Sequence, residues 1–217
     1  MGFKIAIPED AAQDATREHL LEAAANVFAE VGFHAATVRE ICQRAGANIA
    51  AVNYHFGDKE QLYRAVLKET HHCALAKYPA DFGLPPRATA EQRLHAFVFS
   101  FLMRIFSEGR SARHGKLMAR EMIEPTGALD EIVSENIRPM AVVLTGIVGD
   151  LLPKSDVETR RLCAMSVVSQ VLFYHHCRPV VMRMFPDMKF DQKGIEKLAA
   201  HITRFSLTAI RDLAKKK

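Results

Sequence analysis

A short polar and aromatic cluster in residues 37–59 has the residue types that contact nucleic acid. The stretch reads TVREICQRAGANIAAVNYHFGDK. The side-chain amide of Asn53 can pair with the edge of adenine, and a methyl group such as that of Ala50 or Ala51 can touch thymine. Small side chains also let the backbone approach the floor of the major groove closely. Together with the adjacent Tyr54 and His55, these residues favour contact with double-stranded DNA.

Two short helices joined by a tight turn must position this cluster. Thr37 and Glu40 have the spacing of a capping box, in which the hydroxyl accepts from a backbone amide and the carboxylate reaches back to the cap amide. Gly46 accepts the left-handed conformation that ends a helix, and Asn48 is a good cap for the next one. The pattern predicts a helix-turn-helix, with an ordinary helical hairpin of a larger bundle as the alternative. The residues expected to turn inward are Val38, Ile41, Cys42 and Ala45 in the first helix and Ile49, Val52 and Phe56 in the second.

Residues 16–67 resemble the DNA-binding domain of the TetR family of bacterial transcriptional regulators. The family pattern is kept in order and spacing, from AANVFAEVGF at residues 24–33 through ATV at 36–38 and AG at 45–46 to YHF at 54–56, Lys59 and Leu62. The resemblance implies that Thr37, Tyr54, His55 and Lys59 contact phosphates. It implies that base edges are lined by Asn48, Ala50, Ala51 and Asn53. Ile49 stands where many members carry Lys or Arg, and Asn53 where many carry Tyr, which leaves the operator sequence open.

The rest of the chain also has helical periodicity. Further helices are expected at about residues 58–78, 90–107, 111–123, 129–152, 156–177 and 192–215, separated by segments that contain Gly or Pro. No stretch alternates with period two for long enough to predict a strand. The predicted fold is all-α, with a flexible N-terminal arm (1–15), a three-helix helix-turn-helix DNA-binding domain (16–64) and a C-terminal helical ligand-binding and dimerisation domain (65–217).

The last two expected helices are apolar on more than one stripe. The apolar residues are Leu162, Met165, Val167, Val168, Val171, Leu172 and Phe173 in one helix and Ile195, Leu198, Ile202, Phe205, Leu207, Ile210 and Leu213 in the other. A helix of this kind needs two partners. One stripe can face the intramolecular core, and a symmetry-related copy can cover the other in a four-helix interface, as in TetR-like dimers. We therefore expect a homodimer, with a fully internal helix as the alternative.

A ligand cavity is expected between the helices of the C-terminal domain. Flexible and aromatic side chains suit a wall that accepts drug-sized apolar molecules, with plain core packing as the alternative for any one of them. The candidate lining residues are Phe97, Phe101, Met103, Met118, Met122, Met140 and Phe173.

Arg120 and Glu121 stand in the run LMAREMIEPTGAL at residues 117–129. This run resembles a stretch typical of a TetR subgroup that includes the CecR-type regulators of drug-resistance and efflux genes. The resemblance implies an apolar or drug-like inducer, and Arg120 or Glu121 could orient a polar group of that inducer from the cavity wall. A surface or interdomain ion pair is the alternative.

The composition is ordinary for a globular protein, because the 217 residues are 49% hydrophobic and 25% charged, with a formal net charge of +4. The positive excess lies downstream of the helix-turn-helix, since residues 1–64 hold six Lys and Arg against nine Asp and Glu. Phosphate binding must therefore depend on local placement, helix amino termini and neutral donors. We expect a shallower salt dependence of DNA binding than for a protein with a basic arm.

A metal site has weaker support in the sequence. The tripeptide His-His-Cys occurs at residues 71–73 and again at 175–177, which leaves a metal-responsive regulator as an alternative. Adjacent residues on a helix point about 100° apart, so only a tertiary meeting of the two tripeptides could build a tetrahedral site. No metal site and no cofactor are predicted.

Catalysis and membrane insertion are not expected. The sequence has no Gly-rich phosphate loop, nucleophile elbow or HExxH motif, so we predict no enzymatic activity. A helical small-molecule-binding protein or enzyme without a DNA function is a further alternative. No apolar run is expected to reach the length of a membrane span. The four isolated cysteines predict reduced thiols and a cytoplasmic protein.

Together, these patterns and the resemblance predict a ligand-responsive, homodimeric DNA-binding regulator. The specific expectation is a repressor that a small apolar or drug-like molecule releases from a palindromic operator. Ligand binding between the core helices is expected to move the connecting helix at residues 59–78 and to change the separation of the two recognition helices.

Overall fold

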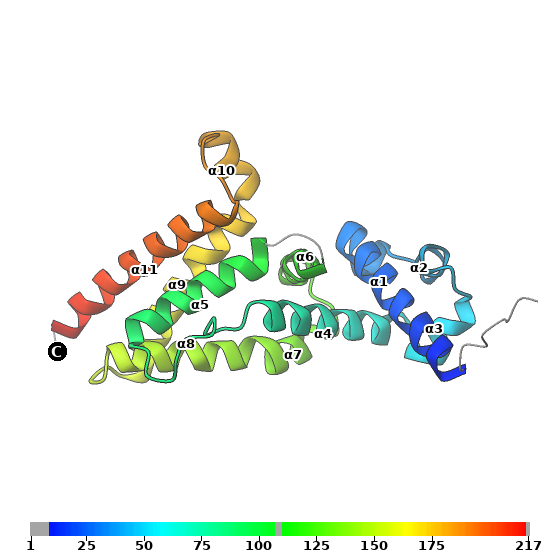
Figure 1. The fold of residues 1–217 in the computed structure, drawn as a ribbon, viewed down its shortest axis with the longest axis horizontal. Helices are drawn as coiled ribbons and strands as arrows, with labels where there is room; N and C mark the ends of the chain where they lie inside the picture. The colour runs from blue at the N-terminus through cyan, green and yellow to red at the C-terminus, as the bar shows by residue number, and fades with distance from the viewer. Residues whose placement is uncertain (1–8, 107–109, 216–217) are drawn as a thin grey trace, which may run out of the picture.

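The computed structural model of the protein describes residues 9–106 and 110–215. All regular elements in these two ranges are helical, which confirms the all-α prediction. One end of the elongated molecule holds α1 (Glu9–Ala35), α2 (Val38–Ala45) and α3 (Ile49–Phe56). The other end is a bundle of α5 (Ala90–Phe106), α8 (Arg138–Leu151), α9 (Val157–His176) and α11 (Gln192–Lys215) (Figure 1). Between the two ends lie α4 (Lys59–Lys77) and α6 (Arg110–Ile123).

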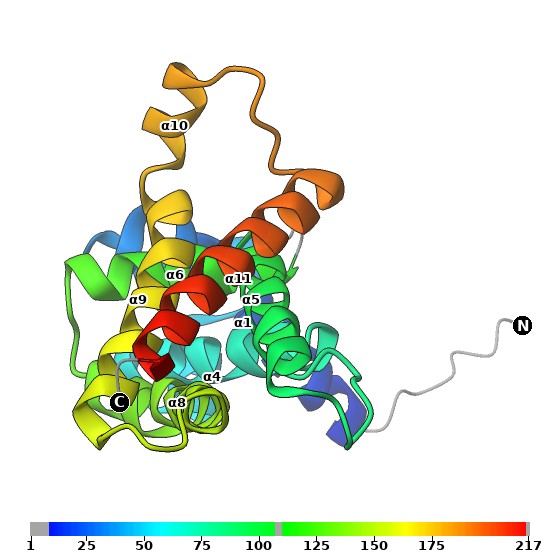
Figure 2. The same ribbon diagram turned by 90° about the vertical axis from the view of Figure 1, so that its left-hand side faces the viewer.

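Three shorter elements complete the chain. α7 (Leu129–Ile132) and the π-helix η1 (Val133–Ile137) lead directly into α8. α10 (Arg178–Met184) projects from the bundle between α9 and α11 (Figure 2). α10 occupies part of the Pro-containing segment that was expected to separate the helices at residues 156–177 and 192–215. Pro179 is compatible with this helix because it stands in the first turn, where a missing backbone amide has no intrahelical partner to lose.

The expected N-terminal arm differs from the structure. α1 begins at Glu9, so residues 9–15 are helical and not part of a flexible arm. They continue the helical pattern of residues 16–31 without a Pro or Gly to end it. Residues 1–8 of the expected arm lie outside the described residues.

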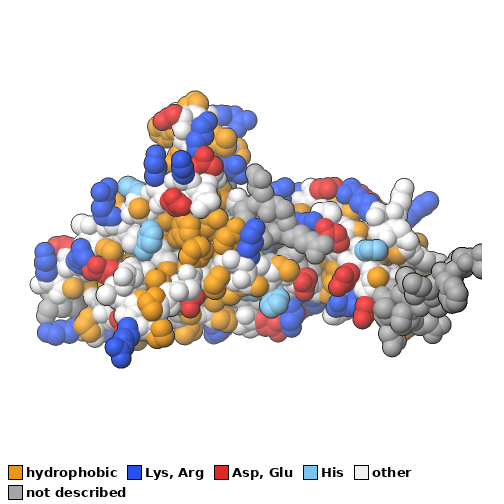
Figure 3. Space-filling view, in the orientation of Figure 1, with side chains coloured by type: hydrophobic (Ala, Val, Ile, Leu, Met, Phe, Trp, Pro, Cys, Tyr) orange, Lys and Arg blue, Asp and Glu red, His pale blue; other side chains and the backbone are white. Residues whose placement is uncertain are grey.

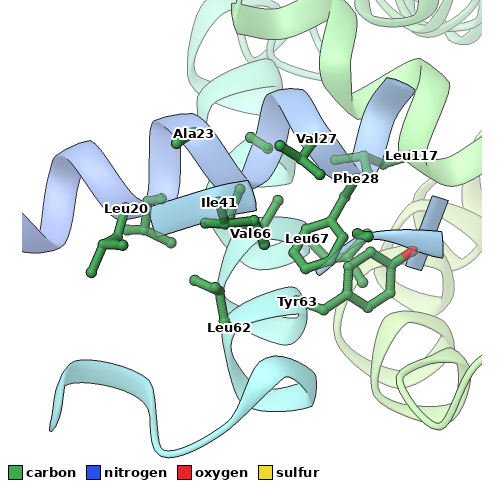
Figure 4. Close-up of a cluster of buried hydrophobic side chains, with 14 of the residues drawn as sticks. Leu20, Ala23, Val27, Phe28, Ile41, Leu62, Tyr63, Val66, Leu67 and Leu117 are labelled. Atoms are coloured by element: carbon green, nitrogen blue, oxygen red, sulfur yellow. The ribbon is translucent and has the colours of Figure 1, made fainter. Parts of the chain in front are cut away.

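The helix-turn-helix end has its own hydrophobic core. Its buried members include Leu20, Val27 and Phe28 from α1, Ile41 from α2, and Leu62, Tyr63, Val66 and Leu67 from α4 (Figure 4). Leu117 of α6 is buried in the same core. α4 therefore crosses the expected domain boundary at residue 64 without a break, and α6 packs directly on the N-terminal unit.

A second core lies in the four-helix bundle. α5 supplies Leu94, Val98 and Leu102, and α11 supplies Ile202, all with no exposed surface. α8 and α9 close the bundle with Leu144 and Val171.

The stretch of α7, η1 and α8, residues 129–151, is long and apolar enough, by length and composition alone, to cross a membrane. The expectation that no apolar run reaches this length is therefore wrong. In the structure the stretch packs within the bundle through Leu144, Ile147 and Val148. Near its start, Glu131 pairs with Arg64 of α4 at 2.7 Å. Only part of the stretch is buried in this way, because Val142 and Val143 are exposed.

Candidate DNA-binding surface and ligand cavity

The caps of the helix-turn-helix lie where the sequence predicts them. The Thr37 hydroxyl accepts a 3.2 Å hydrogen bond from the Glu40 amide and begins α2. Gly46 ends α2 in the left-handed conformation, with φ of 64°. Asn48 begins α3, and its side-chain oxygen accepts from the Ala50 amide at 3.1 Å. The second half of the expected capping box is not formed, because the Glu40 carboxylate pairs with Arg44 at 2.7 Å.

The outer face of α3 carries most of the residues expected to read base edges. Ala50 and Asn53 are exposed, while Ala51 packs partly on the N-terminal core. Val52 is fully buried, as expected. Ile49 was expected to turn inward, but half of its surface is exposed. It lies in the first turn of α3 between exposed neighbours, where the helix projects from the core.

The residues expected to contact phosphates lie on α3 or at the starts of the neighbouring helices α2 and α4. Thr37 is exposed, and Tyr54 has 72% of its surface exposed, with its ring packed edge-on against His55 at 4.9 Å. Lys59 is half-buried at the start of α4. Its Nζ lies 4.6 Å from the centre of the Phe33 ring, and burial lowers its pKa. Lys59 is therefore held against the end of α1.

A cavity of about 200 Å³ lies between α4, α5, α6, η1, α8 and α9. Five of the predicted ligand residues line it: Phe97, Phe101, Met118, Met122 and Met140. The sequence analysis did not assign the remaining lining residues to it: His71, Arg104, Ile105, His114, Gly115, Ala119, Asn136, Ile137, Ala141, Leu144, Val168, Leu172, His175 and His176. The cavity is thus apolar over most of its wall and has a polar, basic part.

Arg104 is the most deeply buried basic residue of this wall, with 4% of its surface exposed. Its Nη1 donates to the backbone oxygen of Tyr78 at 3.0 Å and lies 2.7 Å from the Ser100 hydroxyl. The Ser100 hydroxyl also donates to the Tyr78 oxygen, at 2.8 Å. Burial lowers the pKa of Arg104 to about 10, so the guanidinium remains charged at neutral pH. One sign was visible in the sequence, since Arg104 is the one charged residue of the apolar run FVFSFLMRIF at 97–106.

Three histidines line the same cavity as this arginine. The rings of His71 and His114 are 5.0 Å apart, and His175 lines the same cavity from α9. Burial, with the nearby charge of Arg104, lowers the pKa of His71 to about 4 and that of His114 to about 3. Burial and the neighbouring His176 lower the pKa of His175 to about 4. The three imidazoles are therefore neutral at neutral pH.

Four predicted ligand residues lie elsewhere. The Arg120 guanidinium donates to the backbone oxygens of Ala29 and Glu30, at 3.3 and 2.6 Å, just before α1 is interrupted at Gly32, where φ is 84°. Glu121 is fully buried and accepts hydrogen bonds from Tyr63 and Thr126. Neither residue reaches the cavity, because the side of α6 that carries them packs on α1 and α4. Phe173 points outward from α9, with 53% of its surface exposed, and Met103 packs on the bundle core.

α6 connects the cavity to the helix-turn-helix end. His114, Met118 and Met122 of α6 line the cavity. Other residues of the same helix contact α1 and α4. Arg113 forms an ion pair with Glu22 of α1, and Leu117 is buried in the core of the helix-turn-helix end. Arg120 and Glu121 form the hydrogen bonds to α1 and α4 described above. A change in the cavity that moves α6 must therefore act on α1 and α4 as well.

A larger groove, of about 680 Å³, lies between α5 and α11 beside residues 82–84. On this face of the molecule hydrophobic side chains gather below α10 (Figure 3). The groove is bordered by the charged side chains of Glu91, Glu196, Arg204 and Arg211 and contains none of the predicted ligand residues. The smaller cavity is the better candidate for a ligand site because its walls are formed by helices on several sides.

The two His-His-Cys tripeptides meet only in part. His71 and His175 line the same cavity, but Cys73 lies in a surface depression with Glu69, and Cys177 joins α9 to α10. Among the described residues, no three His, Cys, Asp or Glu side chains are grouped so that they could hold a metal ion. The geometry gives the metal-responsive alternative no support.

These features define the class of protein: a helix-turn-helix unit joined to a helical bundle with a partly open cavity. The family model described as bacterial regulatory proteins, TetR family, matches residues 20–66. The model of the C-terminal domain of the HTH-type transcriptional dual regulator CecR matches residues 90–210.

Individual relatives agree with these matches. The dual regulator CecR of Shigella flexneri is 25% identical over 205 residues, which cover 86% of this chain and 87% of that protein. The transcriptional repressor NicS of Pseudomonas putida is 34% identical over 94 residues, or 42% of this chain and 43% of that protein. A solved TetR-family regulatory protein from Rhodococcus RHA1 superposes with a TM-score of 0.65 at 25% identity, covering 90% of this chain and 96% of that one.

The chain belongs to the TetR family of transcriptional regulators and carries a CecR-type C-terminal domain. This confirms the family resemblance and the prediction of a DNA-binding transcriptional regulator. TetR-type regulators are not enzymes, so the family also decides against the enzymatic alternative.

Proposed function

We propose that the protein is a homodimeric repressor that leaves a palindromic operator when a small molecule enters the cavity. The observation that carries this proposal is the position of α6, which lines the cavity with one side and contacts α1 and α4 with the other. Members of the TetR family bind DNA operators and are typically ligand-responsive dimers.

α3 is the proposed recognition helix. Asn53 and Ala50 on its outer face, with Ala51 beside them, are suited to base edges in the major groove. Asn48 takes part mainly by capping α3, since its side-chain oxygen is engaged, although its amide group remains a donor. Thr37, Tyr54, His55 and Lys59 are the proposed phosphate contacts. The exposed Ile49 can add an apolar contact where many relatives carry a basic residue.

The outward faces of α9 and α11 are the proposed dimer interface. α9 exposes Leu162, Met165 and Phe173, and α11 exposes Phe205 and Leu213. In the view onto this end of the molecule, α9 and α11 lie beside each other with α10 above them (Figure 2). Their exposed apolar side chains would be covered by the same helices of a second copy in a four-helix interface. Val180, Met184 and Phe185, in or next to α10, are exposed as well.

Ligand binding would act on the DNA-binding end through α6 and α4. Arg120 of α6 is hydrogen-bonded to the backbone of α1 at Glu30, and Glu121 of α6 is hydrogen-bonded to Tyr63 of α4. A shift of α6 would therefore displace α1 and α4 together and change the separation of the two α3 helices in the dimer. A coupling free energy of about 1–3 kcal/mol corresponds to a 5- to 150-fold change in operator affinity.

Selection of duplexes from a random DNA pool at near-physiological salt tests the DNA-binding part. The proposal expects enrichment of a palindrome with two half-sites about one helical turn or more apart. A variant with Asn53→Ala and Tyr54→Ala should enrich nothing, while its circular dichroism stays that of the wild type. Enrichment of no sequence by the wild-type protein, with or without cellular small molecules, contradicts the proposed function.

A further inference from the structure

We propose that the ligand of the cavity is a small carboxylic acid with an apolar body, and that Arg104 binds its carboxylate. This inference deepens the proposed function and depends on it for the cavity being the ligand site. It concerns the chemical class of the ligand and the residue that recognises it.

The first argument is the isolation of the Arg104 charge. In the parts of the chain that the structure describes, its side chain contacts the Tyr78 oxygen, the Ser100 hydroxyl and the Phe101 ring, but no carboxylate. A buried charge without a counter-ion is costly, and buried arginines are normally paired. The guanidinium has five N–H donors and a planar fork that matches a carboxylate. A bound acid would supply the missing charge.

The second argument is the composition of the cavity wall. Among the described lining residues there is no Asp or Glu, while the basic part combines Arg104 with His71, His114 and His175. The rest of the wall is apolar, including Phe97, Phe101 and Met118. The wall thus fits a molecule with one negative group and an otherwise apolar body. A phosphate ester would bring about two negative charges, and a single guanidinium is a poorer match for it.

Two imidazole nitrogens without hydrogen-bond partners are a further argument for a carboxylate on the ligand. Only 8% of the surface of His114 is exposed, and His71 is half-buried. The Nδ1 atoms of both rings are buried and have no hydrogen-bond partner among the described residues. A neutral imidazole can present one N–H as a donor, so either ring could donate to a carboxylate oxygen that Arg104 leaves free.

The volume limits the size of the ligand. A cavity of about 200 Å³ is below the range of roughly 300–1,000 Å³ that is usual for drug-sized ligands. The expected molecule is therefore an aromatic or short aliphatic acid, smaller than the drug-like inducer that the sequence analysis predicted.

Arg104 also offers a route from the ligand to the DNA-binding end. Its Nη1 holds the Tyr78 oxygen at the end of α4, the helix whose first half belongs to the helix-turn-helix core. A carboxylate that attracts the guanidinium competes with this carbonyl. Binding of the acid would then loosen the end of α4, in addition to any shift of α6.

Matched acids and amides test the proposal. The probes are benzoate, phenylacetate, hexanoate and octanoate, each paired with its primary amide, and binding to the full-length protein is measured by isothermal titration calorimetry at pH 7. At least one acid should bind about 10- to 150-fold more tightly than its amide, as for a hydrogen bond to a charged group. Arg104→Gln should remove this preference, and Arg104→Lys should retain part of it. Arg93→Gln, on the same helix but outside the cavity, should leave the preference unchanged.

The wild-type comparison does not depend on the folding of any variant. Equal binding of acids and amides, binding of amides alone, or no binding by any of the four acids overturns the proposal. An acid preference that survives in Arg104→Gln overturns the role of Arg104. Operator release is measured in parallel with a selected palindrome. If the operator is bound but only amides release it, the proposed function as a ligand-responsive regulator is supported, and the proposal that the ligand is a carboxylic acid is wrong. If no operator is bound, the proposed function fails while the calorimetry still decides the ligand class.

Discussion

The hydroxyl of Tyr63 on α4 donates a 2.9 Å hydrogen bond to the buried carboxylate of Glu121 on α6. The same carboxylate accepts from the amide and the hydroxyl of Thr126, at 2.8 and 2.9 Å, in the turn before α7. Burial and the bond to Glu121 raise the pKa of Tyr63 well above its usual value, so the hydroxyl stays protonated as a donor. This pair joins the helix of the DNA-binding core to the helix that lines the cavity.

Tyr63→Phe should destabilise the protein. The substitution removes one of the three donors to a fully buried carboxylate, which costs about 1–3 kcal/mol, or roughly 2–12 °C in the melting temperature of a chain of this size. Urea and thermal unfolding measure the loss. Tyr54→Phe removes an exposed hydroxyl and is the matched control, expected to leave stability unchanged. Equal stability of Tyr63→Phe and the wild type would contradict the structural role of the pair.

Asn53→Ala should weaken binding to the selected operator without affecting the fold. Asn53 is exposed on α3, and the loss of a bidentate contact to a base is worth about 1–3 kcal/mol. The loss should be confined to one base pair in each half-site, whereas Tyr54→Phe should weaken all sequences alike because it removes a phosphate contact. Fluorescence anisotropy with operator variants measures both. Gln61→Ala, on the exposed side of α4, is the control.

Phe173→Asp together with Phe205→Asp should give a monomer. Both side chains are more than half exposed in the isolated chain, at 53% and 61%, and would be buried in the proposed interface. Light scattering after gel filtration measures the mass. Operator affinity should fall by about 100-fold or more as the two half-sites lose their linkage. Val142→Asp changes an equally exposed valine of α8 and should remain dimeric. A wild-type monomer at micromolar concentration would contradict the dimer.

Stability should decrease as the pH falls from 7 to 5. The pKa of His114 is lowered to about 3 in the folded protein, against about 6.5 in the unfolded chain. Below pH 6.5 the unfolded state therefore binds a proton that the folded state does not, and the free energy of unfolding falls by roughly 1.4 kcal/mol per pH unit for this residue. His71 and His175, whose pKa values are also lowered, act in the same direction.

Urea denaturation at pH 7, 6 and 5 measures this dependence. His114→Gln has no titrating ring and should show a flatter profile than the wild type. His201→Gln, at an exposed position of α11 outside the cavity, is the control. Parallel profiles for His114→Gln and the wild type would contradict the buried neutral imidazole.

The helix-turn-helix could be predicted from local sequence because local contacts form it. Thr37, Gly46 and Asn48 cap their helices through partners no more than four residues away. Glu40 is an instructive exception. Its carboxylate has two possible partners nearby in the chain, the cap amide of Thr37 and the side chain of Arg44. It contacts Arg44, which also pairs with Glu30 of α1.

The cavity was predictable only in part. Periodicity placed five of the apolar lining residues correctly, since an apolar helix face must turn towards other helices. Periodicity could not tell which of several apolar stripes faces a cavity and which faces solvent. Phe173 was predicted to line the cavity, but its side chain is exposed. The predictions for Ile49 and for residues 9–15 differ from the structure for related reasons. The exposure of a residue in a short helix, and the residue at which a long helix starts, both depend on which other elements pack against that helix.

The sequence by itself determined the helical class, the family and the caps of the recognition unit, because these depend on spacing along one chain. Only the tertiary structure decided the polar contacts of α6 and the basic part of the cavity. Arg120 contacts residues about 90 positions away in the chain, Tyr63 and Glu121 are 58 positions apart, and Arg104 reaches Tyr78 across 26. Such pairs form when packing brings distant helices together, and no local periodicity encodes which of their side chains meet.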